Sequence, residues 1–265
     1  MAVETTSFLV VAWFHGCGLD WANSMRVYWL EQTEADVPQE NDWLSSKDII
    51  FLDQLRFAPR RASWRLGRWT AKRALAAFLN CEASCSTYAR IEIRPALSGA
   101  PEAFLDGKLT RVAISLSHRD GRAFFALATD AAQLGCDLEL IEPHSTAFTS
   151  DYFTSEEQAF IARQPIAEQQ RLPALFWSAK EAALKALHEG LRLDTRSVSV
   201  SLINASPVVR AWDAMEVRYT GGHVFHGWWQ LGDNMVRTIV AEPSPALPIP
   251  LSVPFVAHSE SRQPR

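Results

Sequence analysis

The chain has 265 residues, of which 48% are hydrophobic, and this length suits one large domain or two of ordinary size. Its net charge at pH 7 is −4, so no overall positive field favours nucleic acid or a membrane surface as a partner. No apolar run approaches the about 18 residues that a membrane-spanning helix requires. We therefore expect a globular protein that binds neither nucleic acid nor membrane.

The N-terminal segment and the cysteines indicate a cytoplasmic location. Glu4 stands where a signal peptide carries basic residues, and the apolar run 8–14 has only the length of a strand. The cysteines show none of the paired spacings of a zinc site or a disulfide framework, so we expect free thiols in a reducing compartment. They are Cys17, Cys81, Cys85 and Cys136.

Positive charge is concentrated in one segment. Between Gln54 and Cys81 there is no acidic residue, and the cations are Arg56, Arg60, Arg61, Arg65, Arg68, Lys72 and Arg73. The segment contains RWTAKRALAAFL, which begins at Arg68 and has no Gly or Pro, so it predicts a helix. The charge is thus unevenly distributed, although the net charge is negative.

Three strands are predicted after this helix, within RIEIRP, VAISLSH and RAFFALAT. Ser117 and His118 end the second of them, just before the turn residues Asp120 and Gly121. A hydroxyl and an imidazole at this position could both contact a phosphate. No acidic residue is visibly placed to orient His118 for nucleophilic catalysis, so a structural turn histidine is the alternative interpretation.

The stretch QLGCDLELIEP, residues 133–143, places two carboxylates on one strand. Asp137 and Glu139 share a face about 6–7 Å apart, and their repulsion is roughly 2–3 kcal/mol at an effective dielectric of about 20. Leu138 and Leu140 indicate that the strand is at least half buried. A cation between the acids would relieve the repulsion, and Mg²⁺ is commonly held by carboxylates together with substrate phosphates. An edge strand with two solvated acids is the other interpretation.

Two more helices are predicted downstream. Thr154 to Glu157 form a capping box for a short helix through Ile161, and FWSAKEAALKAL predicts a helix that begins at Phe176 and ends at a left-handed cap at Gly190. One face of the longer helix carries Trp177, Lys180, Glu181, Leu184, Lys185 and His188. This mixture is typical of a cleft wall, and a solvated stripe of Lys and Glu is the alternative.

The two longer helices share the pattern W-x-A-K-x-A with an offset of 108 residues, which pairs Trp69 with Trp177 and Lys72 with Lys180. Each is followed by strand-rich sequence, in the second case within VSVSLI, MEVRY, HGWWQL and VRTIVAE. Two alanine-rich helices could share the pattern by chance. The other interpretation is an internal repeat.

If the repeat is real, the chain is an α+β protein of two pseudo-symmetric α+β halves. The halves would span residues 1–140 and 141–242, followed by a Pro/Ser-rich extended tail at 243–265. Their interface would be a natural ligand cleft. Because that interface lies within one chain, we expect a monomer.

Several stretches, taken in order, resemble one enzyme family. GCDLE is followed by FTSEE and then by FWSAKEAALKALHEGL, and RRASWRLGR and SLSH precede them. They resemble the Sfp-type 4′-phosphopantetheinyl transferases, whose pattern is G-x-D-x-E on a strand followed by W-x-x-K-E-x-x-x-K on a helix. The resemblance covers about residues 44–240.

The resemblance implies a fold of two such halves, with coenzyme A and Mg²⁺ bound between them. It also implies a reaction of the holo-[acyl-carrier-protein] synthase type, in which the 4′-phosphopantetheine arm of coenzyme A passes to a serine of an apo acyl or peptidyl carrier protein. Adenosine 3′,5′-bisphosphate is released. A non-catalytic module of the same fold that binds carrier proteins or nucleotides is one alternative. An unrelated Mg²⁺-dependent enzyme acting on nucleotide phosphates is another.

The resemblance further implies roles for the acids and lysines. Asp137, Glu139 and Glu181 match the metal ligands of the family. Lys180 and Lys185 match its phosphate-binding lysines. Glu181 is the candidate base for the serine proton, and Lys185 could stabilise charge on the departing phosphate.

Other residues match coenzyme A contacts of the family. Ser117 and His118 match positions that contact its phosphates, and His118 joins Glu181 and Lys185 as a catalytic candidate. Arg94 matches a basic residue near the adenosine 3′-phosphate, and the resemblance leads us to expect that Arg60 or Arg61 also contacts this phosphate. The rest of the basic segment could guide docking, because carrier proteins are typically acidic around the modified serine.

The pair His223 and His226 has a spacing compatible with metal binding. We interpret it as a feature of a β-hairpin rather than as a metal site.

Overall fold

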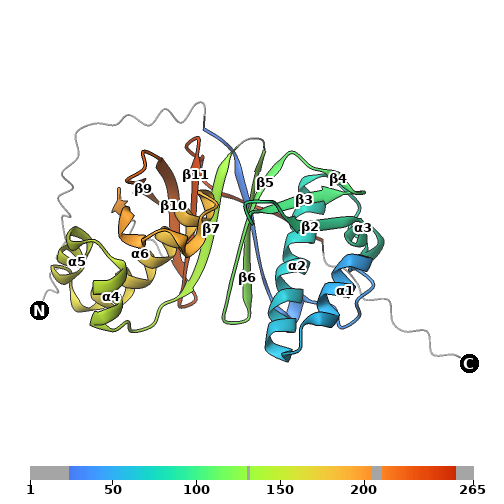
Figure 1. The fold of residues 1–265 in the computed structure, drawn as a ribbon, viewed down its shortest axis with the longest axis horizontal. Helices are drawn as coiled ribbons and strands as arrows, with labels where there is room; N and C mark the ends of the chain where they lie inside the picture. Colours follow the sequence, from blue (N-terminus) through green and yellow to red (C-terminus); the bar gives the residue numbers. More distant parts are fainter. Residues whose placement is uncertain (1–23, 130–131, 204–210, 255–265) are drawn as a thin grey trace, which may run out of the picture.

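The computed structural model describes residues 24–129, 132–203 and 211–254 and shows the predicted mixed α+β fold (Figure 1). The apolar run 8–14 lies outside the described residues. No described helix is long and apolar enough to cross a membrane. The helices are α1 (Ser46–Gln54), α2 (Ala58–Phe78), α3 (Cys85–Arg90), α4 (Thr146–Tyr152), α5 (Ser155–Ala162) and α6 (Ile166–Ala186). The strands are β1 (Val27–Thr33), β2 (Ile91–Pro95), β3 (Pro101–Leu105), β4 (Lys108–Leu109), β5 (Val112–Arg119), β6 (Arg122–Thr129), β7 (Gln133–Leu140), β8 (Val198–Leu202), β9 (Asp213–Tyr219), β10 (Val224–Gly232), β11 (Met235–Glu242) and β12 (Ile249–Pro250).

The described strands form three sheets. A four-stranded sheet has the order β12-β1-β6-β5, a five-stranded sheet has the order β7-β11-β10-β9-β8, and a small sheet has the order β2-β3-β4. Neighbouring strands are antiparallel, except that β12 runs parallel to β1. The strands predicted between residues 90 and 129 and between residues 198 and 242 are confirmed.

Helix α2 packs on the four-stranded sheet, and a hydrophobic core lies between them. Trp69 and Leu75 of α2 share this core with Phe125 and Leu127 of β6. The alternate residues of β6 point to the opposite face of the sheet, and they are buried too. Burial on both faces explains why RAFFALAT is apolar along most of its length.

Helix α6 covers one face of the five-stranded sheet in the same way. Phe176 and Ala183 of α6 share a core with Val217 of β9 and Phe225 of β10. The helix begins at Ile166, upstream of the residue where the sequence pattern placed its start. The left-handed conformation predicted at its end occurs at both His188, with φ 58°, and Gly190, with φ 55°.

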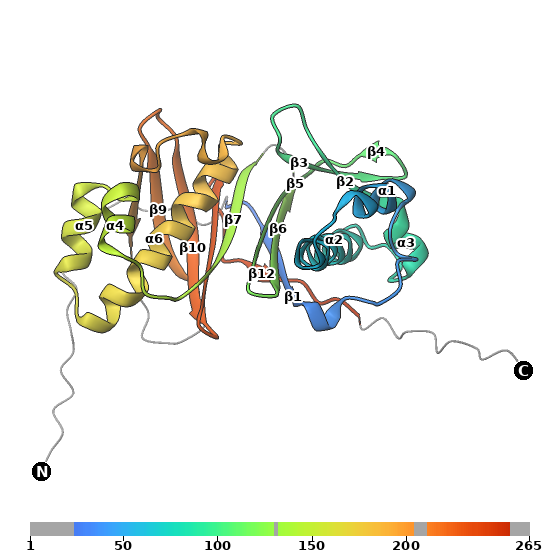
Figure 2. The same ribbon diagram turned by 60° about the horizontal axis from the view of Figure 1, so that its bottom comes forward.

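The two larger sheets pack against each other in the middle of the molecule, with α2 and α6 on the outer sides (Figures 1 and 2). A third apolar cluster fills the layer between the sheets. It contains Phe124 and Ala126 from β6 and Leu138 and Ile239 from β7 and β11. The molecule is therefore layered as helix, sheet, sheet, helix.

The division between the two helix-and-sheet halves differs from the predicted one. We expected the first half to include residues 1–140, whereas β7 pairs with β11 and belongs to the second sheet. Residues 243–254, which belong to the predicted tail, return to the first half, where β12 pairs with β1. Strand pairing over long sequence separations decided both points.

The W-x-A-K motif has the same local role in both halves. Lys72 pairs with Asp48 of α1 at 2.7 Å, and Lys180 pairs with Glu157 of α5 at 2.9 Å. Both lysine side chains are 0% exposed. Both acids are the third residue of a helix and complete its capping box. Each lysine thus ties the long helix to the short helix that precedes it.

Candidate active site

Strand β7 and helix α6 approach each other closely at Gly135. A Cβ at this position would lie 1.8 Å from the backbone oxygen of Ala182. Only glycine therefore allows this contact. Gly135, Asp137 and Glu139 alternate along β7 and point to the same face, so the contact brings α6 beside the two carboxylates.

Helix α6 contributes Glu181 and Lys185 next to Asp137. Lys185 Nζ donates to Asp137 Oδ1 at 2.7 Å and to the backbone oxygen of Cys136 at 3.1 Å. Burial lowers the pKa of Lys185, but the charges of Asp137 and its neighbours outweigh burial and raise this pKa above its ordinary value. Burial, and then the charge of Asp137, raise the pKa of Glu181. We call Asp137, Glu139, Glu181 and Lys185 the β7–α6 cluster.

Glu139 lies at the partly exposed end of this cluster. Its Oε1 accepts a hydrogen bond from Trp177 Nε1 at 3.1 Å, and its Oε2 is 3.6 Å from Arg119 Nε. Burial and the charge of Asp137 raise the pKa of Glu139 to about 7, against the opposing effect of Arg119. The effect of the Asp137 charge on Glu139 agrees with the repulsion between these two acids that the sequence predicted.

The donor set of the cluster suits a hard divalent cation. Within the described ranges, no three His, Cys, Asp or Glu side chains stand close enough together to hold a metal ion. However, Asp137 Oδ2 and Glu181 Oε1 are buried and have no hydrogen-bond partner among the described atoms. Buried carboxylate oxygens without a donor are costly, and a cation would satisfy them. The residues fit an Mg²⁺ ion chemically.

Strand β5 connects the first half to this cluster. Ser117 Oγ donates to Asp137 Oδ1 at 2.7 Å. Two residues earlier on β5, Ser115 Oγ accepts a hydrogen bond from the backbone N–H of Cys136 at 2.9 Å. Two serines of β5 thus bond to β7 across the boundary between the sheets, and Asp137 receives hydrogen bonds from both halves.

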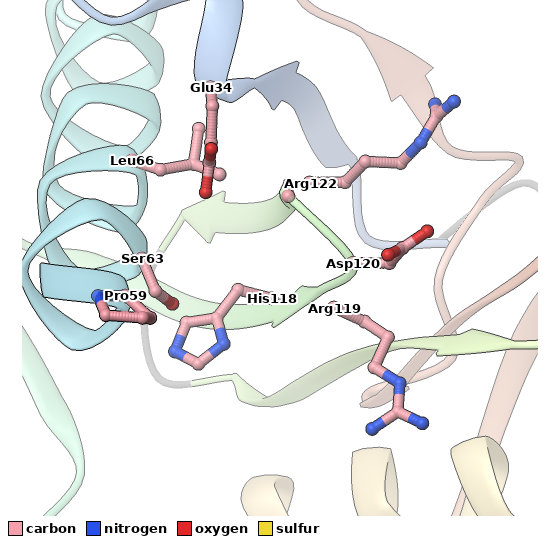
Figure 3. A pocket seen from close by; sticks show the side chains of 9 residues that line it. Glu34, Pro59, Ser63, Leu66, His118, Arg119, Asp120 and Arg122 are labelled. Carbon is pink, nitrogen blue, oxygen red and sulfur yellow. The ribbon is translucent and has the colours of Figure 1, made fainter.

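A pocket of about 300 Å³ lies at the hairpin between β5 and β6 (Figure 3). His118 lies beside Pro59 and Ser63 from the first two turns of α2, and the turn Asp120–Gly121 forms part of the wall (Figure 3). His118 is an exposed side chain next to Ser117. The pocket therefore joins the start of α2 to the strand that contacts Asp137.

The basic residues predicted to meet a phosphate have different surroundings. Arg60 is exposed and follows the pocket residue Pro59. Arg61 instead donates to the backbone oxygens of Leu52 and Leu55, at 2.5 and 3.2 Å, and anchors α2 to the end of α1. Of the two arginines, Arg60 is the one whose surroundings suit a ligand contact.

Arg94 lies on the small sheet rather than in the pocket lining. It pairs with Glu92 at 2.6 Å, and its guanidinium lies over the ring of Phe104, 4.1 Å from the centroid. The side chain is 32% exposed. Its predicted contact with the 3′-phosphate stays a prediction.

Lys180 differs from the expectation that it binds a phosphate. Besides Glu157, it donates to the backbone oxygens of Thr195 and Val198, and burial lowers its pKa against the effect of Glu157. The predicted mixed face of α6 is therefore divided. Lys180 and Leu184 point into the core, whereas Trp177, Glu181 and Lys185 are partly exposed beside β7.

Sequence reasoning missed Arg119 and Arg122. Arg119 donates to Glu142 at 2.6 Å and lies near Glu139, while Arg122 donates to Glu31 at 3.0 Å. Both line the pocket, and their side chains extend in different directions (Figure 3). The sequence feature that could have identified them is their position on either side of the Asp120–Gly121 turn, which follows Ser117 and His118.

The predicted hairpin histidines have other partners. His223 Nδ1 is 3.0 Å from Glu242, and His226 lies between Ser244 and Glu216 at 2.8 and 3.6 Å. His223 lies in the turn between β9 and β10, and His226 lies on β10.

Comparison with known proteins agrees with the motifs. Residues 133–229 match the family model described as the 4′-phosphopantetheinyl transferase superfamily. This segment contains β7 and α6 and hence the whole β7–α6 cluster. The chain is also 23% identical over 197 residues to the 4′-phosphopantetheinyl transferase HetI of Nostoc sp. (strain PCC 7120), an alignment that covers 71% of this chain and 79% of HetI. The resemblance found in the sequence is thus confirmed at the level of the superfamily, because residues 133–229 are similar to the 4′-phosphopantetheinyl transferase superfamily.

Proposed function

We propose that the protein transfers the 4′-phosphopantetheine arm of coenzyme A to a serine hydroxyl of an apo acyl or peptidyl carrier protein. The serine oxygen forms a bond to the β-phosphorus of coenzyme A, the pyrophosphate bond to the adenosine 3′,5′-bisphosphate breaks, and the serine proton is taken up by a base. The observation that carries this proposal is the β7–α6 cluster, where Asp137 meets Lys185 of α6 and Ser117 of the first half.

Each residue of the cluster has a role that suits this chemistry. Asp137, Glu139 and Glu181 would hold Mg²⁺, which when bound supplies positive charge to the pyrophosphate oxygens. Lys185 is held beside Asp137 at 2.7 Å and remains protonated because its pKa is raised. It can therefore stabilise negative charge that develops on the leaving phosphate.

Glu181 is the candidate base for the serine proton. Its pKa is raised by burial and by Asp137, and a base with a pKa closer to neutrality accepts a proton more effectively than an ordinary carboxylate. Glu139, held by Trp177, is less available.

The pocket at His118 would receive the adenosine phosphates. Arg60 is an exposed cation at the start of α2, and His118 is an exposed imidazole at the end of β5. Ser117, which precedes His118, connects this region to Asp137. Arg94 is kept as a candidate contact of the 3′-phosphate, because it is partly exposed.

The protein is proposed to be an enzyme rather than a binding module that has lost its chemistry. All three acids and Lys185 are present, and the charge of Asp137 contributes to the raised pKa values of Glu139, Glu181 and Lys185, as is typical of an active cluster. A module that only binds carrier proteins would have no need of a Glu181 carboxylate whose Oε1 atom is buried without a hydrogen-bond partner among the described atoms.

We also propose that the protein acts as a monomer in the cytoplasm. Both sides of the Ser117–Asp137 contact come from one chain, and the described cysteines are free thiols. Sedimentation equilibrium tests the first point, and a stable dimer would contradict it.

The decisive experiment measures the intact mass of an apo carrier protein after incubation with the enzyme, coenzyme A and Mg²⁺. The expected result is a covalent phosphopantetheine adduct on the carrier serine, with release of adenosine 3′,5′-bisphosphate. Asp137→Ala and Glu181→Ala should each abolish transfer, and chelation of Mg²⁺ should do the same. Binding of the carrier without an adduct would support the non-catalytic alternative instead.

A further inference from the structure

A buried ion pair joins the two halves outside the proposed site. Arg237 of β11 donates from Nε and Nη2 to the two carboxylate oxygens of Glu31 of β1, at 2.5 and 2.8 Å. The arginine side chain is 6% exposed and the glutamate 12%. Arg122 adds a bond to Glu31 at 3.0 Å, and Arg237 also donates to the backbone oxygen of Gly232 at 3.0 Å. This contact links residues 206 positions apart.

The pair lies in the layer between the two sheets. Val27 precedes Glu31 on the same face of β1, and Met235 and Ile239 flank Arg237 on the same face of β11. All three apolar residues belong to the cluster that fills this layer. Burying two charges there costs desolvation that their attraction need not repay. Two apolar residues would hold the sheets together equally well, so a specific geometric role is the better explanation for an ion pair at this place.

Strand register shows what this geometry fixes. Across the first sheet, Glu31 is opposite Phe124, and Phe124 is opposite Ser117. Across the second sheet, Arg237 is opposite Leu138, and its neighbour Thr238 is opposite Asp137. The Glu31–Arg237 pair and the Ser117–Asp137 hydrogen bond therefore stand at the same level of the two sheets.

From these observations we infer that Glu31 and Arg237 are positioning residues, which set the level at which β5 meets β7 and so place Ser117 and His118 opposite the β7–α6 cluster. A bidentate arginine–carboxylate pair defines both distance and orientation, whereas apolar contacts in the same layer allow the sheets to slide. The role in ligand binding rests on the function proposed above.

Loss of the ion pair should affect the two ligands of the proposed enzyme, coenzyme A and Mg²⁺, differently. Coenzyme A has to contact both halves, through His118 in one and Lys185 in the other. The three carboxylates that would hold Mg²⁺ all lie on β7 and α6, within one half. Loss of the pair should therefore weaken binding of coenzyme A and leave the affinity for Mg²⁺ unchanged.

The kinetic test uses Glu31→Gln and Arg237→Met in the full chain. We expect the KM for coenzyme A to rise about tenfold, while the Mg²⁺ concentration for half-maximal rate stays within about twofold. Arg237→Lys, which keeps the charge but not the paired geometry, should give an intermediate KM. An unchanged KM, or a parallel loss of Mg²⁺ affinity, would overturn the inference.

The matched control is Asp48→Asn, which breaks a buried ion pair with Lys72 inside the first half. It should lower thermal stability without changing the KM for coenzyme A. If it raises this KM as much as Glu31→Gln does, general destabilisation explains both results and the positioning role is wrong.

A second test does not depend on any enzymatic activity. The amide of Cys136 bonds to Ser115 across the halves, and the amide of Val200 bonds to the Glu157 carboxylate within one half. In Glu31→Gln, hydrogen exchange at Cys136 should become about tenfold faster, and exchange at Val200 should not change. Equal behaviour of the two amides would refute the inference, whereas absence of transfer in the unaltered protein would refute only the proposed function.

Discussion

Lys180 and Lys185 lie on the same helix and match the same family motif, yet their surroundings are opposite. Lys180 is fully buried and bonds to Glu157 and to backbone oxygens. Lys185 is 28% exposed and bonds to Asp137. A spacing of five residues turns them away from each other on the helix, so one lysine supports the fold and the other is available to a ligand.

This contrast gives a prediction for two matched variants. Lys185→Met should lower kcat by about 100-fold or more, because a positive group beside the leaving phosphate is lost. Lys180→Met should reduce the free energy of unfolding by about 3–5 kcal/mol, because Glu157 is left buried and unpaired. Transfer assays and chemical denaturation measure the two effects, and an inactive but fully stable Lys180→Met would contradict the assignment.

The acids of the cluster predict a pH-dependent response to Mg²⁺. The pKa of Glu139 is raised from 4.5 to about 7 by burial and by Asp137. Without metal, the folded state therefore binds more protons than the unfolded chain between these values, and stability falls as the pH rises through them.

Protons and Mg²⁺ should compete for the same carboxylates. We expect Mg²⁺ to raise the melting temperature more at pH 8 than at pH 5.5, in scanning fluorimetry at fixed ionic strength. Glu139→Gln should reduce this difference. An equal stabilisation at both pH values would argue against metal binding by these acids.

Helix α6 and strand β7 act as one unit, because the site is built on their close contact. Gly135 permits that contact, and the W-x-x-K-E-x-x-x-K spacing directs Glu181 and Lys185 toward β7 while Lys180 anchors the opposite side of α6. The two sequence motifs thus lie on two elements that pack directly against each other, β7 and α6.

Gly135→Ala tests this contact. Its Cβ would overlap the backbone oxygen of Ala182, so β7 and α6 must separate, and we expect a loss of about 1–3 kcal/mol in the free energy of unfolding together with loss of transfer. The control is Gly67→Ala, whose Cβ would meet only a side-chain methyl of Leu116 at 3.1 Å. Similar effects of both substitutions would show that the close contact is not the cause.

The whole molecule is held together by the layer between its two larger sheets. Phe124, Leu138 and Ile239 in this layer are each no more than 1% exposed, and the segment after β11 returns to pair with β1. Each half would therefore expose the apolar residues of this layer if it were separated from the other half.

We expect the two halves to unfold in one cooperative transition. Circular dichroism and tryptophan fluorescence should give coincident denaturation curves, because Trp69 lies in one half and Trp229 in the other. Two separated transitions would show that the shared layer contributes little to stability.

The sequence by itself determined the local features of this protein. Alternation of apolar residues predicted most strands, the capping box at Thr154 predicted α5, and the G-x-D-x-E and W-x-x-K-E-x-x-x-K patterns indicated the superfamily. These features depend on residues close together in the chain, where side-chain periodicity and spacing fix the local geometry.

Only the tertiary structure decided which residues meet across the chain. The pairing of β7 with β11, the burial of Lys180, the anchoring of Arg61 on α1 and the Glu31–Arg237 pair all depend on contacts between distant segments. A side chain has the same local sequence whether it points into a core or into a pocket. Its role is set by the sheet and helix packed against it, and local periodicity carries no information about that partner.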